Sequence, residues 1–231
     1  MNILVTGGAG YIGSYFIKQL IKQSDANIIV ADIFLQGKDN ILKNKRISYL
    51  EADIRDYKAM RKIFQSHPLD AVVHFAAIAN VPDSIKRPLD YYETNITGSL
   101  NVLRCMRETN VQKIIFSSSA AVYGEPIEKE ISEGHPKKPI NPYGFSKLVF
   151  ETILEDCHKA HGLNSISFRY FCAAGADEEF EMGERHEPET HVIPALFQTA
   201  LGKRAVFSVC GNDFPTPDGT GVRDYIHVND L

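Results

Sequence analysis

A glycine-rich segment, residues 6–13, limits the possible folds more than any other feature of the sequence. It follows the apolar run 3–5 and precedes residues 14–23, whose apolar side chains recur at helical spacing. Its glycines fit two overlapping dinucleotide patterns, Gly8-x-Gly10-x-x-Gly13 and Gly7-x-x-Gly10-x-x-Gly13. Such glycines let backbone amides approach a pyrophosphate at the N-terminus of a helix. The segment therefore predicts a strand, a phosphate-binding loop and a helix.

A carboxylate follows the next predicted strand. Residues 28–31 form an apolar run that ends in Asp32, nineteen residues after Gly13. A carboxylate at this place can accept hydrogen bonds from both ribose hydroxyls of NAD, and it repels the additional phosphate of NADP. The sequence therefore predicts NAD as the cofactor.

Strand and helix patterns continue to alternate along the chain. Strands are predicted at 47–50, 71–77 and 113–116, and helices at 57–64, 89–109 and from 143 onward. This alternation is typical of a parallel sheet with helices on both faces. We expect the α/β class, with a Rossmann-type doubly wound parallel sheet.

Several residues follow the predicted strands where a cofactor would lie. Asp53 and Ile54 are expected to border the adenine ring, with Asp53 accepting from its amino group. The run from Phe75 through Ala76 and Ala77 would end the fourth strand, where small side chains leave room for the cofactor. His74 lies inside an apolar strand, and we expect a hydrogen-bonded core histidine.

Tyr143 and Lys147 are four residues apart, which places both side chains on one face of a helix. The pKa of a tyrosine is about 10 and must fall by about 3 units for it to act as a base at neutral pH. A lysine ammonium 4 Å away could supply an interaction of about that size. The alternative is a half-exposed tyrosine beside a solvated lysine. Three serines, 117–119, end the preceding strand, and one could meet the tyrosine over a substrate atom.

Composition narrows the possible partners. The chain has 231 residues, 44% of them hydrophobic, and a net charge of -4 without a basic stripe. This argues against nucleic-acid and membrane-surface binding and favours small molecules. The cysteines, at 105, 157, 172 and 210, form no Cys-x-x-Cys pair, so neither a zinc site nor a disulfide framework is predicted. Reduced thiols fit a cytoplasmic protein.

Five segments together resemble the extended short-chain dehydrogenase/reductase family. They are TGGAGYIG at 6–13, FSSSAAVYG at 116–124, NPYGFSK at 141–147, RYF with AAGA at 169–176, and PTPDGTGVRDYIHV at 215–228. The last two segments are similar to those of the UDP-glucose 4-epimerases within that family. The resemblance covers the whole chain.

The resemblance implies a reaction and its residues. NAD would oxidise C4 of the hexose, Tyr143 would remove the 4-hydroxyl proton, and reduction of the 4-keto sugar on its other face would interconvert UDP-glucose and UDP-galactose. Ser119 would bridge the 4-oxygen and Tyr143, while Lys147 would hold the nicotinamide ribose and lower the tyrosine pKa. Arg223 would bind the diphosphate.

The expected binding residues follow from the motifs and the resemblance together. Those expected to bind the cofactor are Gly7, Gly10, Tyr11, Ile12, Gly13, Asp32, Asp53, Ile54, Phe75, Ala76, Ala77, Asn95, Ser117, Tyr143, Lys147, Tyr170 and Phe171. Those expected to bind the substrate are Ser119, Tyr143, Cys172, His191 and Arg223. No metal ligands are predicted.

Three positions bear on which member of the family this is. The related 4,6-dehydratases need an acidic residue beside the catalytic serine, but Ala120 and Ala121 follow Ser119 here, which favours epimerisation. Cys172 stands where the family usually has asparagine, and a thiol is a poor replacement for an amide. His191 stands where some relatives have asparagine.

The chain ends at Leu231 just after a helix-start signal, whereas the resemblance implies a longer substrate domain. We therefore expect a truncated member of the family. The resemblance implies an NAD-binding domain at 1–165 and a partial, smaller substrate domain at 166–231, which is an incomplete nucleotide-sugar-binding region. Two alternatives to the epimerase stay open: another NAD-dependent nucleotide-sugar enzyme, or an NAD-binding fragment without activity. The resemblance also implies a homodimer formed through helices 89–109 and 143–161.

Overall fold

The computed structural model describes residues 1–35, 40–179, 182–186, 188–209 and 211–231. Cys210 lies outside the described residues, as do parts of the region 166–231 at 180–181 and 187. Six strands form the main sheet: β1 Asn2–Thr6, β2 Asn27–Asp32, β3 Ile47–Glu51, β4 Ala71–His74, β5 Lys113–Ser117 and β6 Asn164–Phe168. The helices of this part are α1 Tyr11–Gln23, α2 Tyr57–Ser66, α3 Val81–Lys86, α4 Pro88–Tyr92, α5 Ser99–Glu108 and α6 Pro142–His161.

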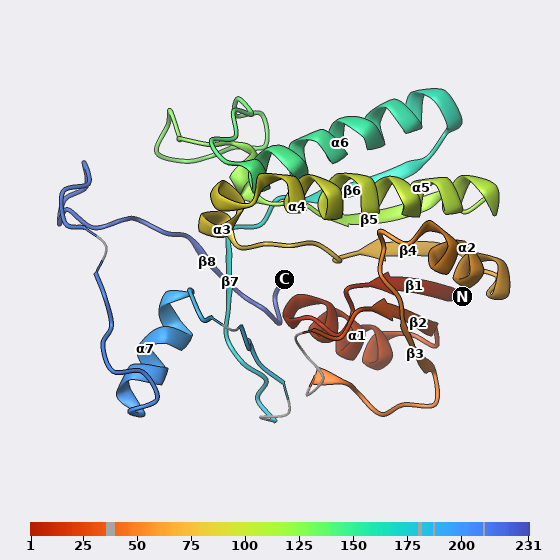
Figure 1. Cartoon of the computed structure of the whole chain (residues 1–231), viewed down its shortest axis with the longest axis horizontal. Coiled ribbons are helices and arrows are strands. Elements are labelled where there is room, and N and C mark those ends of the chain that lie inside the picture. Colours follow the sequence, from red (N-terminus) through yellow and green to blue (C-terminus); the bar gives the residue numbers. More distant parts are fainter. Residues whose placement is uncertain (36–39, 180–181, 187, 210) are drawn as a thin grey trace.

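The six strands are all parallel and follow the order β3-β2-β1-β4-β5-β6. The order reverses between β1 and β4, so loops at the carboxyl ends of these two strands diverge and leave room for a ligand. The predicted α/β fold with a Rossmann-type doubly wound sheet is confirmed (Figure 1).

Apolar residues alternate between the two faces of the sheet. One face buries Leu4, Ile29 and Val72 beneath α2, α5 and α6, whose core side chains include Met60, Val102 and Phe150. The other face buries Ile3, Val5, Ile28, Val30 and Val73 against α1, mainly through Ile17. Because strands β1, β2 and β4 are apolar on both faces, they occupy the centre of the sheet.

A smaller region follows the main sheet. It contains the two-stranded parallel sheet of β7 Cys172–Ala174 and β8 Tyr225–His227, together with α7 Val192–Ala200. Side chains of α1 hold this region: Tyr11 donates to the Gly175 carbonyl at 2.6 Å, and Lys18 pairs with Asp177 at 2.8 Å. In Figure 1 the C-terminus returns to the neighbourhood of α1. No helix in the described ranges is long and apolar enough to cross a membrane.

The predictions for one strand and one helix need correction. β4 ends at His74 and not at Ala77, because the amides of Phe75 and Ala76 both donate to the Thr6 carbonyl, which turns the chain out of the ladder. The predicted helix 89–109 is divided into α4, a π-helical segment Glu93–Gly98 and α5. π-helical turns are rare and occur mostly at functional sites.

Candidate active site

The glycine loop packs so closely that side chains would not fit. Gly7 has a φ of 71°, and a Cβ there would lie 2.5 Å from the Ala76 amide nitrogen. A Cβ on Gly13 would lie 2.3 Å from the Gly7 carbonyl oxygen. Gly10 is the N-cap of α1, and it has no side chain to cap the free amides of Tyr11 and Ile12. These unpaired amides and the helix dipole suit a phosphate group.

Asp32 connects β2 with the glycine loop. It is buried, and its carboxylate accepts from the Ala9 amide at 3.0 Å and from the Phe34 amide at 2.8 Å. Burial raises the pKa of this carboxyl, while the backbone donors oppose the change. The glycine loop and the Asp32 carboxylate at the end of β2 fit a dinucleotide whose ribose carries no 2′-phosphate. The residues present therefore fit NAD.

In the loop after β3, the side chains of Asp53 and Ile54 have different surroundings. Arg55 pairs with Asp53 at 2.6 Å and lowers the pKa of its carboxyl. Ile54 is buried against Gly98, where a Cβ would come within 2.7 Å of the Ile54 side chain. Asp53 is thus partly engaged by Arg55 before any ligand is bound, a contact that was not predicted from the sequence.

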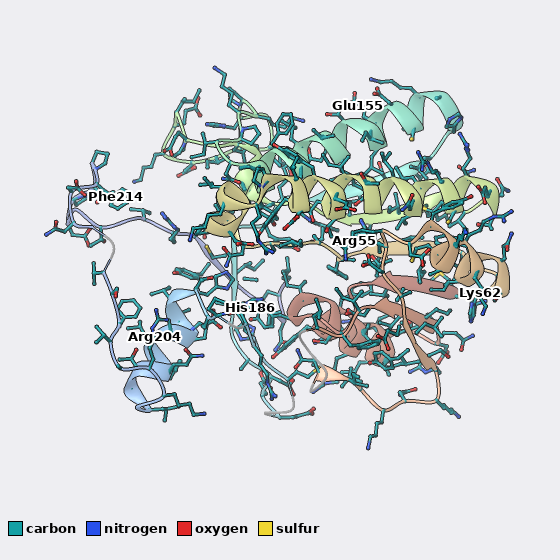
Figure 2. The ribbon with its side chains drawn as sticks, viewed as in Figure 1. Arg55, Lys62, Glu155, His186, Arg204 and Phe214 are labelled. Carbon is teal, nitrogen blue, oxygen red and sulfur yellow. The ribbon has the colours of Figure 1, made fainter. Side chains whose placement is uncertain are left out.

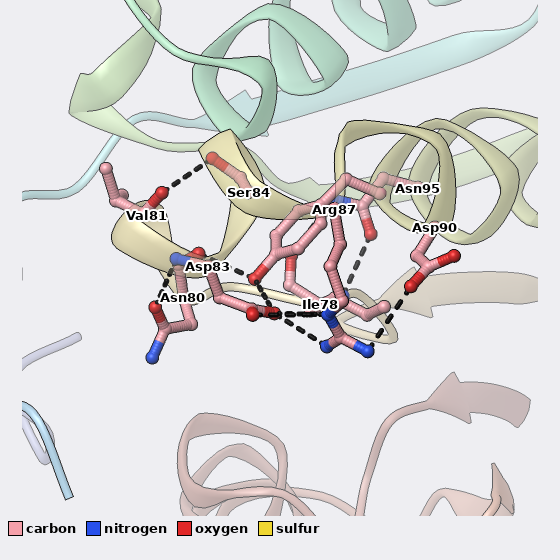
Figure 3. A network of polar contacts seen from close by, with 9 residues as sticks. Ile78, Asn80, Val81, Asp83, Ser84, Arg87, Asp90 and Asn95 are labelled. Carbon is pink, nitrogen blue, oxygen red and sulfur yellow. Dashed lines mark hydrogen bonds and ion pairs between the residues drawn. The ribbon is translucent and has the colours of Figure 1, made fainter. Parts of the chain in front are cut away.

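Asn95 fixes the loop after β4 against α6. Its side chain accepts from the Ile78 amide at 2.9 Å and donates to the Ile78 carbonyl at 3.0 Å and to Ser146 Oγ at 3.1 Å. The adjoining network in Figure 3 joins the Arg87 guanidinium to Asp83 at 2.6 Å and to Asp90 at 3.3 Å. The loop 75–80 is therefore held in one position beside the glycine loop.

Tyr143, Ser119 and Lys147 meet at the carboxyl end of β5. The Ser119 side chain lies close enough to Tyr143 to lower the pKa of its hydroxyl, and the Ser119 Oγ accepts from the Ala121 amide at 3.1 Å. Lys147 is buried, and its Nζ donates to the Ser117 carbonyl at 2.7 Å and lies 5.7 Å from the centroid of the Tyr143 ring. The structure thus brings together the three residues that were predicted to be catalytic.

Burial is the main influence on the pKa values of Tyr143 and Lys147, and the lowering of the tyrosine pKa by the lysine stays a prediction. Burial raises the pKa of Tyr143, and the hydrogen bond with Ser119 opposes the rise. Burial also lowers the pKa of Lys147 to about 7, so its charge is much reduced at neutral pH.

His74 is the predicted core histidine: it hydrogen-bonds Thr6 and Ser99, and burial lowers its pKa to about 3.

A buried acidic residue that the sequence reading missed supports the serines. Glu151 accepts from Ser118 Oγ at 2.5 Å and binds both ends of the Arg169 guanidinium at 2.8 and 2.7 Å. Arg169 also donates to the Tyr123 hydroxyl at 3.0 Å. The signal for Glu151 was available, because it follows Lys147 by four residues and shares its helix face.

The aromatic pair after β6 differs in exposure. Tyr170 is half-buried, its hydroxyl contacts Ser117 Oγ, and its carbonyl accepts from the Ala120 amide at 3.0 Å. Phe171 is 38% exposed, so part of its side chain faces solvent. Tyr170 and Ser117 thus lie together with the catalytic trio, and Phe171 lies at the edge.

The predicted substrate residues outside the trio lie in the smaller region. Cys172 is half-buried in β7, its amide donates to the Asp224 carbonyl at 3.1 Å, and burial raises the pKa of its thiol. Arg223 is exposed and donates to the carbonyl of Val222 at 2.7 Å. His191 is the N-cap of α7 and contacts Glu184.

Curated relatives match the whole chain. A UDP-glucose 4-epimerase of Halalkalibacterium halodurans is 46% identical over 231 residues, and the match covers 68% of its own length. A UDP-glucose 4-epimerase of Lacticaseibacillus casei is 44% identical, with 69% of its length covered. The chain thus spans about two thirds of these relatives.

Solved structures agree with this result. A UDP-glucose 4-epimerase from Brucella ovis in complex with NAD superposes with a TM-score of 0.93 at 43% identity, over 99% of this chain and 70% of that one. One from Bifidobacterium longum in complex with NAD+ and UDP gives a TM-score of 0.94 at 38% identity, over 100% and 71%. The model of the NAD dependent epimerase/dehydratase family matches residues 3–231. The chain therefore belongs to the NAD dependent epimerase/dehydratase family.

Proposed function

We propose that this chain interconverts UDP-glucose and UDP-galactose with NAD as its cofactor. The observation that carries the proposal is the half-buried Tyr143, which lies beside Ser119 and Lys147 at the strand ends that face the glycine loop. The names of the relatives support the same reaction, since several that are more than 40% identical are UDP-glucose 4-epimerases.

Each residue of the trio has a distinct task in this proposal. Bound NAD supplies reversible hydride transfer at C4 of the sugar, so that a 4-keto sugar forms and can be reduced on either face. Tyr143 takes the proton of the 4-hydroxyl and returns it, while Ser119 orients the 4-oxygen. Lys147 holds the nicotinamide ribose. Ala120 and Ala121 leave no acidic group beside Ser119 for the elimination of water.

The binding roles of the other residues are proposals as well. Gly7, Gly10 and Gly13, with the amides of Tyr11 and Ile12, would hold the pyrophosphate, and Asp32 would accept from the adenosine ribose. The adenine would lie near Asp53 and Ile54, and the nicotinamide near Tyr170 and Phe171. Further cofactor contacts are assigned to Phe75, Ala76, Ala77, Asn95 and Ser117.

The substrate would contact Cys172 and Arg223 in addition to the catalytic trio. His191 is assigned to the substrate as well, unless the side chain is engaged by the group proposed in the next section.

We also keep the division into an NAD-binding part, 1–165, and a sugar-nucleotide part, 166–231, as a proposal, although β6 extends across residue 165. The cytoplasmic location stays a prediction that rests on the cysteine pattern.

Dimerisation through α5 and α6 is part of the proposal. A groove between these helices is lined by apolar side chains that include Leu100, Leu103, Met106 and Ile153. Apolar helix faces of this kind suit a helix-to-helix interface. Sedimentation of the chain as a strict monomer at micromolar concentration would contradict this part.

The test uses the purified chain and UDP-galactose, with UDP-glucose measured by chromatography and NADH by absorbance. We expect conversion without net NADH, and a loss of about 10²–10⁴-fold in Tyr143→Phe. Tyr57→Phe on the surface of α2 is the matched control and should retain activity. Conversion that survives in Tyr143→Phe would remove the assigned base. NAD binding without any conversion by the unchanged chain would reduce the proposal to a cofactor-binding protein, and accumulating NADH would indicate a different oxidoreductase.

A further inference from the structure

Four side chains in the smaller region converge on one point outside the catalytic trio. Glu184, His186, Glu189 and His191 each present one oxygen or nitrogen, and these four atoms all lie within 4.8 Å of one another. We call these four residues the Glu–His cluster. The sequence contains them as two Glu-x-His pairs, 184–186 and 189–191. No metal site was predicted there, because the spacing matches no familiar ligand pattern.

Burial within the Glu–His cluster is uneven. The carboxylates are covered, with side-chain exposures of 7% for Glu184 and 3% for Glu189, while the imidazoles of His186 and His191 are 34% and 56% exposed. His186 Nδ1 lies 3.2 Å from Glu184 and 3.9 Å from Glu189. His191 Nδ1 also contacts Glu184. The two imidazoles are therefore more exposed than the two carboxylates, and all four groups lie within 4.8 Å of one another.

The backbone holds the cluster from both sides. Before it, Asn40 hydrogen-bonds Gly183 in both directions, at 3.3 and 3.4 Å, and Tyr15 on α1 donates to the Met182 carbonyl at 3.0 Å. After it, the Glu189 carboxylate accepts from the amides of Thr190 and His191, both at 2.8 Å. Outer hydrogen bonds of this kind orient metal-binding carboxylates. In the view of Figure 2, His186 lies between α7 and α1.

We propose that the Glu–His cluster binds one Zn²⁺ ion with four protein ligands. Imidazole nitrogens and carboxylate oxygens are both zinc ligands, and a site closed by four protein groups is typical of structural zinc. Two carboxylates and two neutral imidazoles also balance the charge of a divalent ion. The ion would tie the segment that leads into α7 to the segment held by α1. This proposal does not depend on the reaction proposed above.

The first test measures the metal directly on the full chain. The chain is stripped with a chelator, dialysed and titrated with Zn²⁺ in a calorimeter and with Co²⁺ in a spectrophotometer. We expect one ion per chain and the strong visible absorption of four-coordinate Co²⁺, which Zn²⁺ abolishes by displacement. Weak absorption typical of six-coordinate Co²⁺, or the absence of stoichiometric binding, would overturn the proposal. It would leave a hydrogen-bonded cluster of ion pairs.

The second test locates the ion. His186→Gln and Glu189→Gln should each weaken Zn²⁺ binding by at least tenfold, since even outer-shell changes cost about 10–100-fold. His161→Gln, at the exposed end of α6, is the matched control and should bind as the unchanged chain does. At the same Zn²⁺ concentration the melting temperature of the chain and of His161→Gln should rise more than that of His186→Gln. Equal affinity in all of them would place the ion elsewhere and refute the assignment.

Discussion

Gly144 on α6 lies directly against the backbone of Ala121. A Cβ atom on Gly144 would come within 2.5 Å of the Ala121 carbonyl oxygen. Tyr143 precedes this contact on one segment, and Ser119 precedes it on the other. The missing side chain therefore lets the helix and the turn approach closely, which brings Tyr143 and Ser119 near each other.

We predict that Gly144→Ala damages activity more than stability. The added methyl group must push α6 away from Ala121, since real Cβ atoms do not come within 3 Å of a carbonyl oxygen. A displacement of about 1 Å between catalytic groups can cost about 10²-fold in rate, whereas overpacking costs about 1–3 kcal/mol of unfolding free energy. Epimerase assays and urea denaturation of the same protein measure the two effects.

The matched control is Gly134→Ala. Gly134 lies in the loop before α6, and a Cβ there would meet only Ser132 Oγ, at 4.0 Å. This variant should keep both activity and stability. If Gly144→Ala retained full activity with a correctly folded chain, the close approach would have no bearing on the Tyr143–Ser119 geometry.

Lys147 should make the stability of the cofactor-free chain depend on pH. Burial lowers the pKa of its ammonium from 10.5 to about 7. Between these two values the unfolded chain holds a proton that the folded chain has released, so the free energy of unfolding rises with pH. The slope of this contribution approaches about 1.4 kcal/mol per pH unit, and it vanishes below pH 7, where both states are protonated. Urea denaturation between about pH 7 and pH 9 measures it.

Lys147→Met is the comparison for this prediction. It removes the titrating group but keeps an unbranched side chain of similar length in the buried position. The stability of this variant relative to the unchanged chain should be greatest at the low end of the pH range and should decline as the pH rises. Parallel pH profiles for the two proteins would show that Lys147 does not have a lowered pKa.

Glu151 should contribute much more to stability than its neighbour on the helix surface. It is buried and joins Ser118 to Arg169, so Glu151→Ala leaves a largely buried guanidinium without its carboxylate. Removing one partner of a buried ion pair costs about 3–5 kcal/mol, and the partial exposure of Arg169 favours the lower end. Denaturation with urea should show this loss.

Glu155→Ala on the same helix is the control. Glu155 pairs with Lys159 at 2.9 Å, but both side chains are 64% exposed, and its label in Figure 2 marks the outer surface of α6. Exposed pairs of this kind contribute about 0.2–1 kcal/mol. Equal losses in Glu151→Ala and Glu155→Ala would contradict the structural role of Glu151.

Local patterns in the sequence were sufficient for the main sheet. The apolar runs that end in Thr6 and Asp32 correspond to β1 and β2, and the glycine loop lies where its spacing indicates. The doubly wound topology follows, because strands alternating with helices have few ways to form a parallel sheet. The early end of β4 could not be predicted from the sequence. This strand stops at His74 because the amides of Phe75 and Ala76 both donate to the Thr6 carbonyl.

For a related reason, only part of the site could be predicted from the sequence. The spacing of Tyr143 and Lys147 suggested one helix face, whereas the choice of Ser119 among three serines came from the family resemblance. The pKa values of Tyr143 and Lys147 depend on burial by distant segments, which spacing does not reveal. The Glu–His cluster joins side chains of 184–186 and 189–191 in an arrangement that the sequence pattern did not predict.

The choice of cofactor gives the last prediction, which concerns Asp32. Its carboxylate ends β2 and accepts from the Ala9 amide, so the residue supports the glycine loop and would present negative charge to the proposed ribose site. Asp32→Asn keeps an acceptor oxygen for Ala9 but removes the charge. We expect NAD to bind about tenfold more weakly, as a charge-assisted hydrogen bond becomes a neutral one, and the ratio of NADP to NAD affinity to rise.

Asp53→Asn is the control that separates charge at the ribose from charge near the adenine. Arg55 already engages Asp53 at 2.6 Å, so its loss should change NAD affinity little and leave the discrimination against NADP intact. Calorimetric titration of both variants with NAD and NADP decides between the sites. If Asp53→Asn relaxed the discrimination and Asp32→Asn did not, the ribose would lie beside β3, because only a carboxylate next to the 2′ position repels the additional phosphate.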